Sequence, residues 1–231
     1  MARWDIFEAG VLCYNAPAMT LPRTKPVVFV DWYGTLSDQF LWHSFKEGSP
    51  KERHVREEIM RLFFKKPNEI REAWQRGEMT SEALVDDIAK TLQEDHRLLW
   101  YRFEDDLKTT RFSDVGLLDA LHALRTYACV VLATDSGDSF HGIVERLRLR
   151  EMFDDILTSA DRGATKQDVR AFFANYQEPF EHGHAFLIDD KSSVCDAFSR
   201  AGGSVFLVGR DGSTRQGLSE ALKWARAQPY V

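Results

Sequence analysis

Acidic, hydroxyl and lysine side chains follow short apolar runs at several points along the 231-residue chain. These polar residues are Asp31, Thr134, Asp135, Lys166, Asp189 and Asp190. Carboxylates can act as nucleophiles, and they can hold a magnesium ion, which prefers oxygen ligands. A hydroxyl, a lysine and glycine-flanked backbone N–H groups can neutralise the charge of a phosphoryl group. Together these residue types are what phosphoryl transfer requires.

The elements that would position these residues are indicated by apolar runs and helical spacings. Five short runs are rich in Val, Ile, Leu or Phe and end in polar or glycine residues, at 27–30, 129–133, 153–157, 185–188 and 205–208. Such runs are typical of strands buried on both faces of a parallel sheet. Between them, apolar residues recur with helical spacing at 140–147, 169–176, 194–201 and 218–225. The alternation predicts an α/β fold with a doubly wound parallel sheet, whose carboxyl edge would gather the polar residues.

The segment at 45–110 interrupts this alternation, because it contains no strand-like run. It is dense in charge, and its apolar residues share two helical faces. We therefore predict a helical cap at 45–110, inserted into a core formed by 26–44 and 111–231. Residues 1–25 are expected to form an N-terminal extension.

The predicted cap is asymmetric in charge. Nine Lys/Arg stand against six Asp/Glu at 46–76, and four stand against nine at 77–108. Such an asymmetry can steer an anion toward one side of a cleft. We expect Lys51, Arg53 and Arg56 to face an anionic substrate.

Composition narrows the class of protein. The chain is 44% hydrophobic and 29% charged, which is typical of globular proteins, and its net charge of −6 argues against broad nucleic-acid binding. Three unclustered cysteines, Cys13, Cys129 and Cys195, suit a reducing compartment and exclude a disulfide scaffold. No apolar run approaches the roughly 20 residues of a membrane span, and no signal peptide is apparent. We expect a cytoplasmic protein that acts on a small anionic molecule, with no nucleic acid or membrane as partner; composition does not indicate an oligomeric state.

Taken in order, the motifs resemble those of the haloacid dehalogenase-like (HAD) superfamily. Residues 31–36, Asp-Trp-Tyr-Gly-Thr-Leu, resemble its first motif, and Thr134 resembles its second. Lys166, in Gly-Ala-Thr-Lys-Gln, resembles the third motif, and Asp189-Asp190 resemble the fourth. The segment at 45–110 stands where that superfamily places a helical cap. The resemblance implies a HAD-like hydrolase with a Rossmann-like core, a helical cap and Mg²⁺ as cofactor.

The resemblance also implies a role for each matched residue. Asp31 would be the nucleophile that forms an aspartyl-phosphate. Asp190 would be the main magnesium ligand, with Asp189 beside it or bound through water, and with Asp31 and the Tyr33 carbonyl completing the metal site. The phosphate would be bound by residues around Asp31, namely Gly34, Thr134, Asp135 and Lys166. Asp135 stands where the family often has Asn, and it could instead be a turn former.

Tyr33 departs from the phosphatase pattern. Phosphatases of this superfamily carry a second Asp two residues after the nucleophile, and it protonates the leaving group and then activates water. A phenol with a pKa near 10 cannot replace that base at neutral pH, and such proton transfer typically contributes about 10²–10⁴-fold. The Asp-x-Tyr-Gly-Thr pattern also resembles haloacid dehalogenases, which use no metal and lack the acidic pair found here. Three interpretations stay open: a magnesium-dependent phosphatase with an atypical Tyr33, a 2-haloacid dehalogenase-like hydrolase, or a catalytically degenerate binding or regulatory protein.

Overall fold

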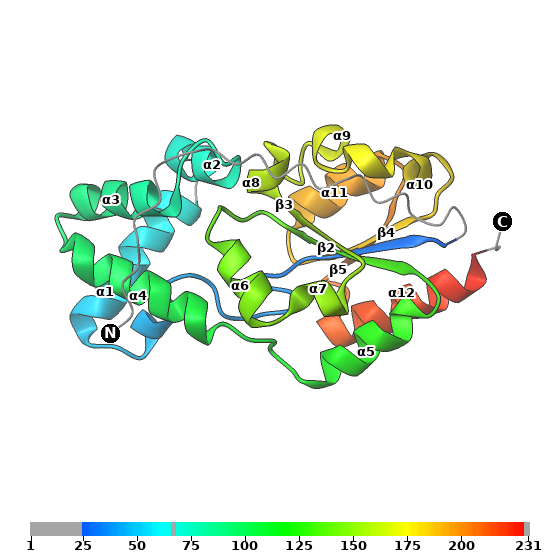
Figure 1. Cartoon of the computed structure of the whole chain (residues 1–231), viewed down its shortest axis with the longest axis horizontal. Helices are drawn as coiled ribbons and strands as arrows, with labels where there is room; N and C mark the ends of the chain where they lie inside the picture. Colours follow the sequence, from blue (N-terminus) through cyan, green and yellow to red (C-terminus); the bar gives the residue numbers. More distant parts are fainter. Residues whose placement is uncertain (1–24, 66–67, 229–231) are drawn as a thin grey trace.

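The central feature of the computed structural model is a parallel sheet with helices on both faces (Figure 1). The structure describes residues 25–65 and 68–228. Within them the sheet has five strands in the order β3-β2-β1-β4-β5. The strands are β1 (Val27–Val30), β2 (Cys129–Thr134), β3 (Asp155–Thr158), β4 (Ala185–Asp189) and β5 (Ser204–Leu207). All four strand pairings are parallel, which confirms the predicted α/β fold class.

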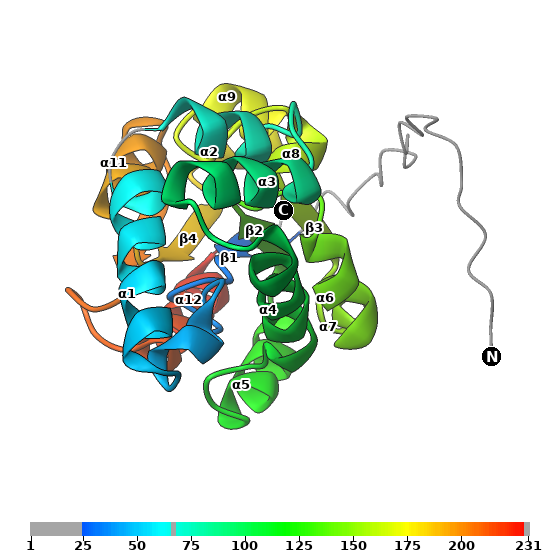
Figure 2. The same cartoon turned by 90° about the vertical axis from the view of Figure 1, so that its left-hand side faces the viewer.

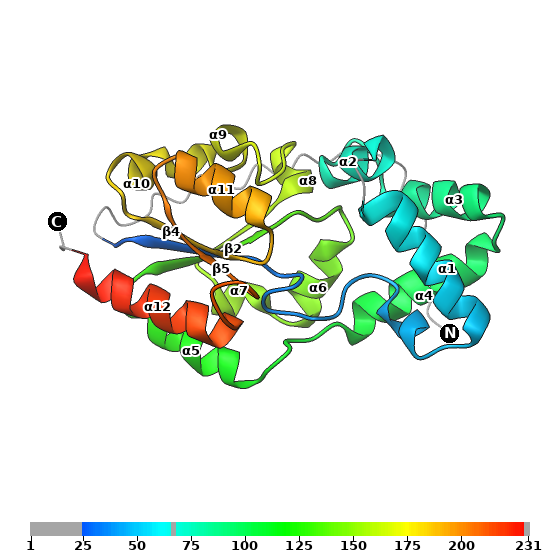
Figure 3. The ribbon, with the colours of Figure 1, turned by 180° about the vertical axis from the view of Figure 1, so that it is seen from behind.

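The two faces of the sheet are covered by different helices, as Figure 3 shows from behind. One face carries α5 (Gly116–Arg125), α6 (Phe140–Arg146), α7 (Leu149–Met152) and α12 (Thr214–Ala227). The other carries α8 (Ser159–Arg162), α9 (Val169–Phe172), the 3₁₀ turn η3 (Ala174–Tyr176), α10 (Gln177–Glu181) and α11 (Ser192–Arg200). Alternate residues of β1 point to opposite faces, so Val28 and Val30 join the first cluster and Val27 and Phe29 the second.

Two elements differ from the sequence prediction. The single helix expected at 169–176 is broken at Phe173, whose ring packs edge-to-face on Phe29 with 4.6 Å between centroids. Tyr176 also packs on Phe29, and its hydroxyl donates to Asp155 at 2.6 Å. These contacts fix the backbone against the local helical preference. The third strand begins at Asp155 rather than at 153, because the Asp154 carboxylate accepts the Val130 N–H at 2.8 Å and so lies outside the strand.

Residues 43–110 form a helical layer beside the carboxyl edge of the sheet, which we call the helical insertion (Figure 2). Its described residues form η1 (His43–Lys46), α1 (Pro50–Ile59), a π-helical turn η2 (Met60–Phe64), α2 (Glu69–Gln75), α3 (Ser81–Leu92) and α4 (His96–Thr109). A capping box between Ser49 and Glu52 begins α1, and the Thr80 hydroxyl accepts the Ala83 N–H at the start of α3. The insertion and the residues just before it share a separate core, which includes Trp42, Trp74 and Phe103.

The insertion is connected to the sheet by two adjacent segments. The Ser113 N–H donates to the Leu36 carbonyl at 2.9 Å, and the Arg111 N–H donates to the Gln39 side chain at 2.9 Å. A second contact lies at the carboxyl edge of the sheet, where the Ser81 N–H donates to Asp138 at 2.9 Å. The insertion is therefore anchored on both sides of the sheet edge. The predicted extension at 1–25 lies, apart from its last residue, outside the described residues, and no helix in the described ranges could span a membrane.

Candidate active site

Three neighbouring strands bring the predicted residues to one edge of the sheet. The order β2-β1-β4 places the carboxyl ends of these strands side by side, with Val30 in register with Leu132 and Ile188. Asp31 directly follows β1, and Thr134 and Asp189 are the last residues of β2 and β4. The parallel register therefore gathers residues that lie more than 150 positions apart in the sequence.

Lys166 is the charged centre of the site. Its side chain is fully buried, and its Nζ lies 2.7 Å from Asp31 Oδ1 and 2.5 Å from Asp189 Oδ2. The loop that carries Lys166 is held by Asp135, whose Oδ1 accepts the Lys166 N–H at 2.8 Å. Asp135 thus fixes the lysine backbone and also lines the adjoining cavity. A buried lysine between two carboxylates gives each of them a cationic partner where water is excluded.

The acidic pair at the end of β4 divides into a buried and an exposed carboxylate. Asp189 is buried and also accepts the Lys191 N–H at 2.8 Å, whereas Asp190 is exposed. Asp190 approaches Gly34, where a Cβ would collide with its carboxylate and where φ is +82°. The approach and the left-handed backbone both require glycine at this position.

The same carboxylates could hold a metal ion. Asp31, Asp189 and Asp190 each offer an oxygen atom, and these atoms lie within 4.8 Å of one another. Oxygen ligands of this kind are those that Mg²⁺ prefers. Both Asp189 oxygens accept hydrogen bonds from Lys166 or Lys191, whereas Asp31 uses only Oδ1 for Lys166. The donor set therefore fits a magnesium ion held by Asp31 and Asp190, with Asp189 orienting the lysine.

Burial changes the ionisation of the site. Desolvation raises the pKa of Asp31 to about 7, although the nearby Lys166 ammonium opposes this shift. Burial and the neighbouring Asp189 charge also raise the pKa of Asp190. Burial alone would lower the pKa of Lys166, but the Asp189 and Asp31 charges outweigh it and hold that pKa above its usual range. A cation beside these carboxylates would favour their charged forms.

Thr134 presents a hydroxyl that the protein leaves free. Its Oγ1 is buried and has no hydrogen-bond partner among the described residues. Thr134 also lines the cavity beside Asp31. A buried hydroxyl without a partner costs free energy, so this hydroxyl is suited to donate to an oxygen of a bound ligand.

Tyr33 lies on the cavity side of Asp31, where its ring packs edge-to-face on two phenylalanines. The ring centroids lie 5.1 Å from Phe40 and 6.2 Å from Phe140. Burial, with the Asp106 and Asp31 charges, raises the pKa of the Tyr33 phenol above its usual value. The phenol therefore stays protonated at neutral pH and cannot act as a general base.

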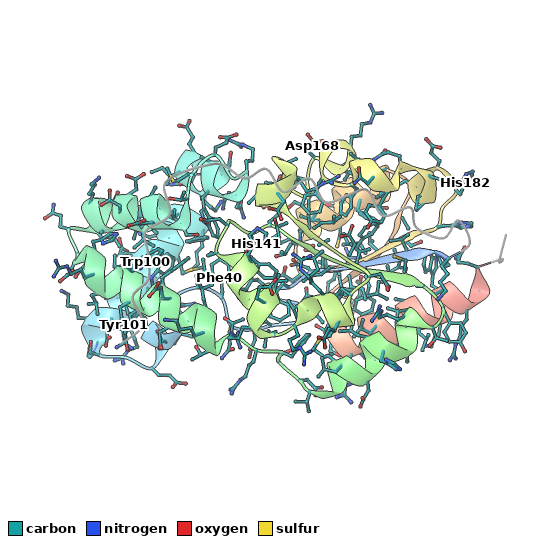
Figure 4. All side chains as sticks on the ribbon, viewed as in Figure 1. Phe40, Trp100, Tyr101, His141, Asp168 and His182 are labelled. Atoms are coloured by element: carbon teal, nitrogen blue, oxygen red, sulfur yellow. The ribbon has the colours of Figure 1, made fainter. Side chains whose placement is uncertain are left out.

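A cavity of about 590 Å³ lies between the sheet edge and the helical insertion. The sheet side is lined by Asp31, Tyr33, Gly34, Asp38, Thr134, Asp135, Thr165, Gln167, Asp190, Lys191, Ser193 and Val194. The other side, which we call the insertion wall, is lined by Phe40, just before the insertion, and by Met60, Phe64, Arg71, Glu72, Gln75 and Arg76 of the insertion. Figure 4 labels Phe40, which lies between the helical layer and the sheet. Of the predicted residues, six line the cavity and two, Lys166 and Asp189, are buried against Asp31.

The basic residues predicted to face a substrate are not those that line the cavity. Lys51, Arg53 and Arg56 are absent from its described lining; Lys51 is exposed and lies 2.8 Å from Glu94. Arg71 and Arg76, from the same basic half of the insertion, line the cavity instead. Net charge along a sequence does not indicate which face of a helix a side chain occupies. Phe40, Met60 and Phe64 also went unpredicted, because apolar residues at helical spacing are typical of core positions.

Comparisons with known proteins bear on the fold. No protein-family model and no curated protein matches the chain. A protein described as a predicted HAD-like family hydrolase, from Porphyromonas gingivalis, superposes with a TM-score of 0.65 at 12% identity, over 89% of this chain and 100% of that one. A HAD family enzyme from Bacteroides thetaiotaomicron, in complex with magnesium and inorganic phosphate, gives 0.59 at 18% identity, over 79% and 93% of the two chains. L-2-haloacid dehalogenase from Xanthobacter autotrophicus gives 0.59 at 15% identity, over 80% and 78%. The chain therefore has the fold of the HAD superfamily, as its motifs predicted.

Proposed function

We propose that the protein is a magnesium-dependent hydrolase of a small phosphorylated molecule, in which Asp31 forms an aspartyl-phosphate. The observation that carries this proposal is the arrangement around Asp31. One buried lysine lies within 2.7 Å of its carboxylate, and two further carboxylates and an unpartnered threonine hydroxyl adjoin it. A structural neighbour was crystallised with magnesium and inorganic phosphate. Acidic ligands and phosphate-binding donors on one sheet edge suit phosphoryl transfer.

Each residue of the site has a distinct role in this proposal. Asp31 attacks the phosphorus, a P–O bond forms on its carboxylate, and the bond to the leaving oxygen breaks. The Thr134 hydroxyl donates to a phosphoryl oxygen, while Lys166 holds Asp31 in place and offsets its charge. Asp31 and Asp190 would hold the magnesium ion, which supplies positive charge to the phosphoryl oxygens. Water then attacks the phosphorus, which releases phosphate and restores Asp31.

Tyr33 defines which substrates this site can cleave well. A protonated phenol offers no base, and the carboxylate that would supply one is absent at this position. An alkoxide leaving without a proton is costly, whereas an aryl oxide or carboxylate leaves more readily. The proposal is therefore a preference for aryl or acyl phosphates over alkyl phosphates.

The test is phosphate release from 4-nitrophenyl, acetyl and alkyl phosphates with and without Mg²⁺. We expect magnesium-dependent release, faster for the first two, and loss of at least about 10³-fold in Asp31→Asn because the nucleophile is gone. Gln167→Ala, at an exposed lining position, is the matched control for protein quality. Equal rates in Asp31→Asn and the natural protein would overturn the proposal.

A second candidate, a 2-haloacid dehalogenase-like hydrolase, is favoured by Tyr33 and by one of the structural neighbours. Halide release from 2-chloropropionate, independent of added metal, would support it. Against it stands the acidic group of Asp31, Asp189 and Asp190, whose mutual repulsion a metal ion would relieve. A degenerate binding protein would bind Mg²⁺ but hydrolyse neither class of substrate.

We place the reaction in the cytoplasm, in keeping with the free, buried thiols of Cys129 and Cys195.

A further inference from the structure

The cavity is larger than a phosphoryl group requires. Its volume of about 590 Å³ lies within the range of about 300–1,000 Å³ in which proteins bind small organic molecules. The phosphoryl group would lie against Asp31 and Thr134, at the sheet edge. The remaining space is bounded by the helical insertion, so the rest of a substrate would contact that wall.

The insertion wall combines an apolar surface with one incompletely partnered cation. Phe40 and Phe64 pack edge-to-face with 5.0 Å between ring centroids, and Tyr33 also packs edge-to-face on Phe40, at 5.1 Å. Met60 lies in the same turn as Phe64 and lines the cavity with it. This row of three rings offers an apolar contact surface between the phosphate end of the cavity and α2.

Arg71, on α2, has guanidinium N–H donors that make no hydrogen bond to the described residues. Its Nη1 donates to the Phe64 carbonyl at 3.1 Å, which fixes the guanidinium beside the apolar wall. Its Nη2 lies 3.6 Å from Glu72, too far for a hydrogen bond, and its buried Nε has no partner in the described ranges. The side chain is 20% exposed. A guanidinium has five N–H donors; the Phe64 carbonyl uses one of them and the Nε donor is buried, so the donors that can reach a ligand are the remaining ones on Nη1 and Nη2.

Arg76 lines the same cavity but is already paired. Its Nε and Nη2 donate to the two carboxylate oxygens of Glu78, at 2.7 and 3.1 Å. Such a bidentate pair uses the guanidinium edge that would otherwise grip a carboxylate. The two arginines thus offer a comparison on one wall: Arg71 has Nη donors without a hydrogen-bond partner among the described residues, whereas the guanidinium edge of Arg76 is occupied by Glu78.

We propose that Arg71 and the adjoining rings of Phe40 and Phe64 form a second substrate subsite, which binds a carboxylate or similar anionic group at the far end of a small organophosphate. This inference rests on the proposed function, since it takes the phosphate end of the cavity to be at Asp31. The substrate class is a monophosphate with an apolar middle and a second anionic group. Glu72 lies beside Arg71 and would repel that group, so the Nη donors of Arg71 must offset this repulsion.

The experiment uses phosphonates, whose P–C bond is not hydrolysed at such a site. A series of ω-carboxyalkyl phosphonates of increasing chain length, each matched with its primary amide, is titrated calorimetrically into the magnesium-loaded protein. The amide keeps the size and removes the charge. At one chain length we expect the carboxylate to bind about 10- to 100-fold more tightly than its amide, as a charged hydrogen bond to a guanidinium provides.

Variants assign this preference to a residue. Arg71→Gln should reduce the ratio of the two affinities to near one, and Arg71→Lys should keep part of it because the charge remains. Arg76→Gln, whose guanidinium is held by Glu78, should keep the full ratio. The proposal is overturned if no chain length shows a carboxylate preference, if that preference survives in Arg71→Gln, or if Arg71→Gln weakens both ligands equally.

Hydrolysis of phenyl phosphate, which lacks a second anionic group, tests the proposed function by itself. If the carboxylate preference depends on Arg71 while no phosphate ester is cleaved, the subsite stands and the proposed reaction fails. If phenyl phosphate is cleaved and no preference appears, the reaction stands and the subsite fails.

Discussion

The two walls of the cavity are built in different ways. On the sheet side, charged groups are buried and bound to one another, as in the contacts of Lys166 with Asp31 and Asp189 at 2.7 and 2.5 Å. On the insertion side, apolar side chains and two arginines line the cavity, and Arg71 has Nη donors without a hydrogen-bond partner among the described residues. The buried network on the sheet side tolerates little loss of its cation, because removal of Lys166 would leave two buried carboxylates unpaired. Substitutions in a wall of apolar contacts and arginine side chains can alter which ligand is bound, with little loss in the free energy of unfolding.

The largest expected effect falls on the sheet side. Lys166→Met removes the cation between two buried carboxylates, and we expect a loss of about 3–5 kcal/mol in the free energy of unfolding of the metal-free protein. Urea denaturation followed by circular dichroism measures this loss. Lys191→Met is the matched control, because that lysine is half exposed and lies 3.9 Å from Asp135, so its loss should change stability by less than about 1 kcal/mol. Equal losses in the two variants would contradict the contrast between the walls.

The next effect concerns Tyr33, where the two walls meet. Tyr33→Asp supplies a carboxylate two residues after Asp31, and it should raise the rate on alkyl phosphates by about 10²-fold or more, relative to aryl phosphates. Tyr33→Phe removes only the phenol oxygen, so its ratio of aryl to alkyl rates should stay close to that of the natural protein. Steady-state phosphate release gives both ratios. A large loss in Tyr33→Phe would show instead that the phenol takes part in the reaction.

A pH-dependent effect follows from the buried carboxylate of Asp31. Its pKa is about 7 in the folded protein, against an ordinary value of 3.8, so the folded state holds a proton that the unfolded state has lost between these pH values. Stability of the metal-free protein should therefore fall as the pH rises from about 4 to 7. Asp31→Asn cannot ionise, so its melting temperature should exceed that of the natural protein by several degrees at pH 8 and by less at pH 5.

Thermal unfolding without metal, at the two pH values, measures this difference. Asp38→Asn, at an exposed position on the cavity, is the control and should show no comparable gain. A melting temperature for Asp31→Asn that stays below that of the natural protein at pH 8 would contradict the pKa argument.

The smallest effect is expected at the outer surface of the insertion. Combined neutralisation of Lys51, Arg53 and Arg56 to Gln should change KM for an anionic substrate by less than about twofold at 0.15 M salt, because none of the three lines the cavity and the exposed charges of Lys51 and Arg53 are screened by salt. A several-fold rise in KM would instead support the prediction from the sequence that these three residues face an anionic substrate.

The contrast between the walls also explains what the sequence could predict. Asp31, Thr134, Lys166 and the Asp189-Asp190 pair follow strands or stand before a helix, and parallel topology alone brings such positions to one edge. Their types and order were therefore sufficient to place them together. Only the family resemblance assigned different roles to Asp189 and Asp190; residue type and order do not, because these roles depend on which carboxylate is buried against Lys166 and which faces Gly34.

The insertion wall was harder to predict. Phe64 is the last residue of η2 and Arg71 lies on α2, and their contact arises from the way α2 packs on η2. Helical periodicity distinguishes a buried face from an exposed one, but it does not distinguish a face that lines a cavity from one that packs in a core. The break at Phe173 has a similar origin, since ring packing on Phe29 overrode a helical spacing.

The most direct test of the central claim, that Asp31 is the nucleophile, is the mapping of a covalent phosphoryl group. The protein is incubated with acetyl phosphate and Mg²⁺, quenched in acid and digested, and the phosphorylated peptide is sequenced by mass spectrometry. We expect one phosphoryl group on Asp31, which accumulates because Tyr33 supplies no base for its hydrolysis, and none in Asp31→Asn. Phosphate released at a steady rate with the phosphoryl group on another residue, or an undiminished adduct in Asp31→Asn, would contradict the account.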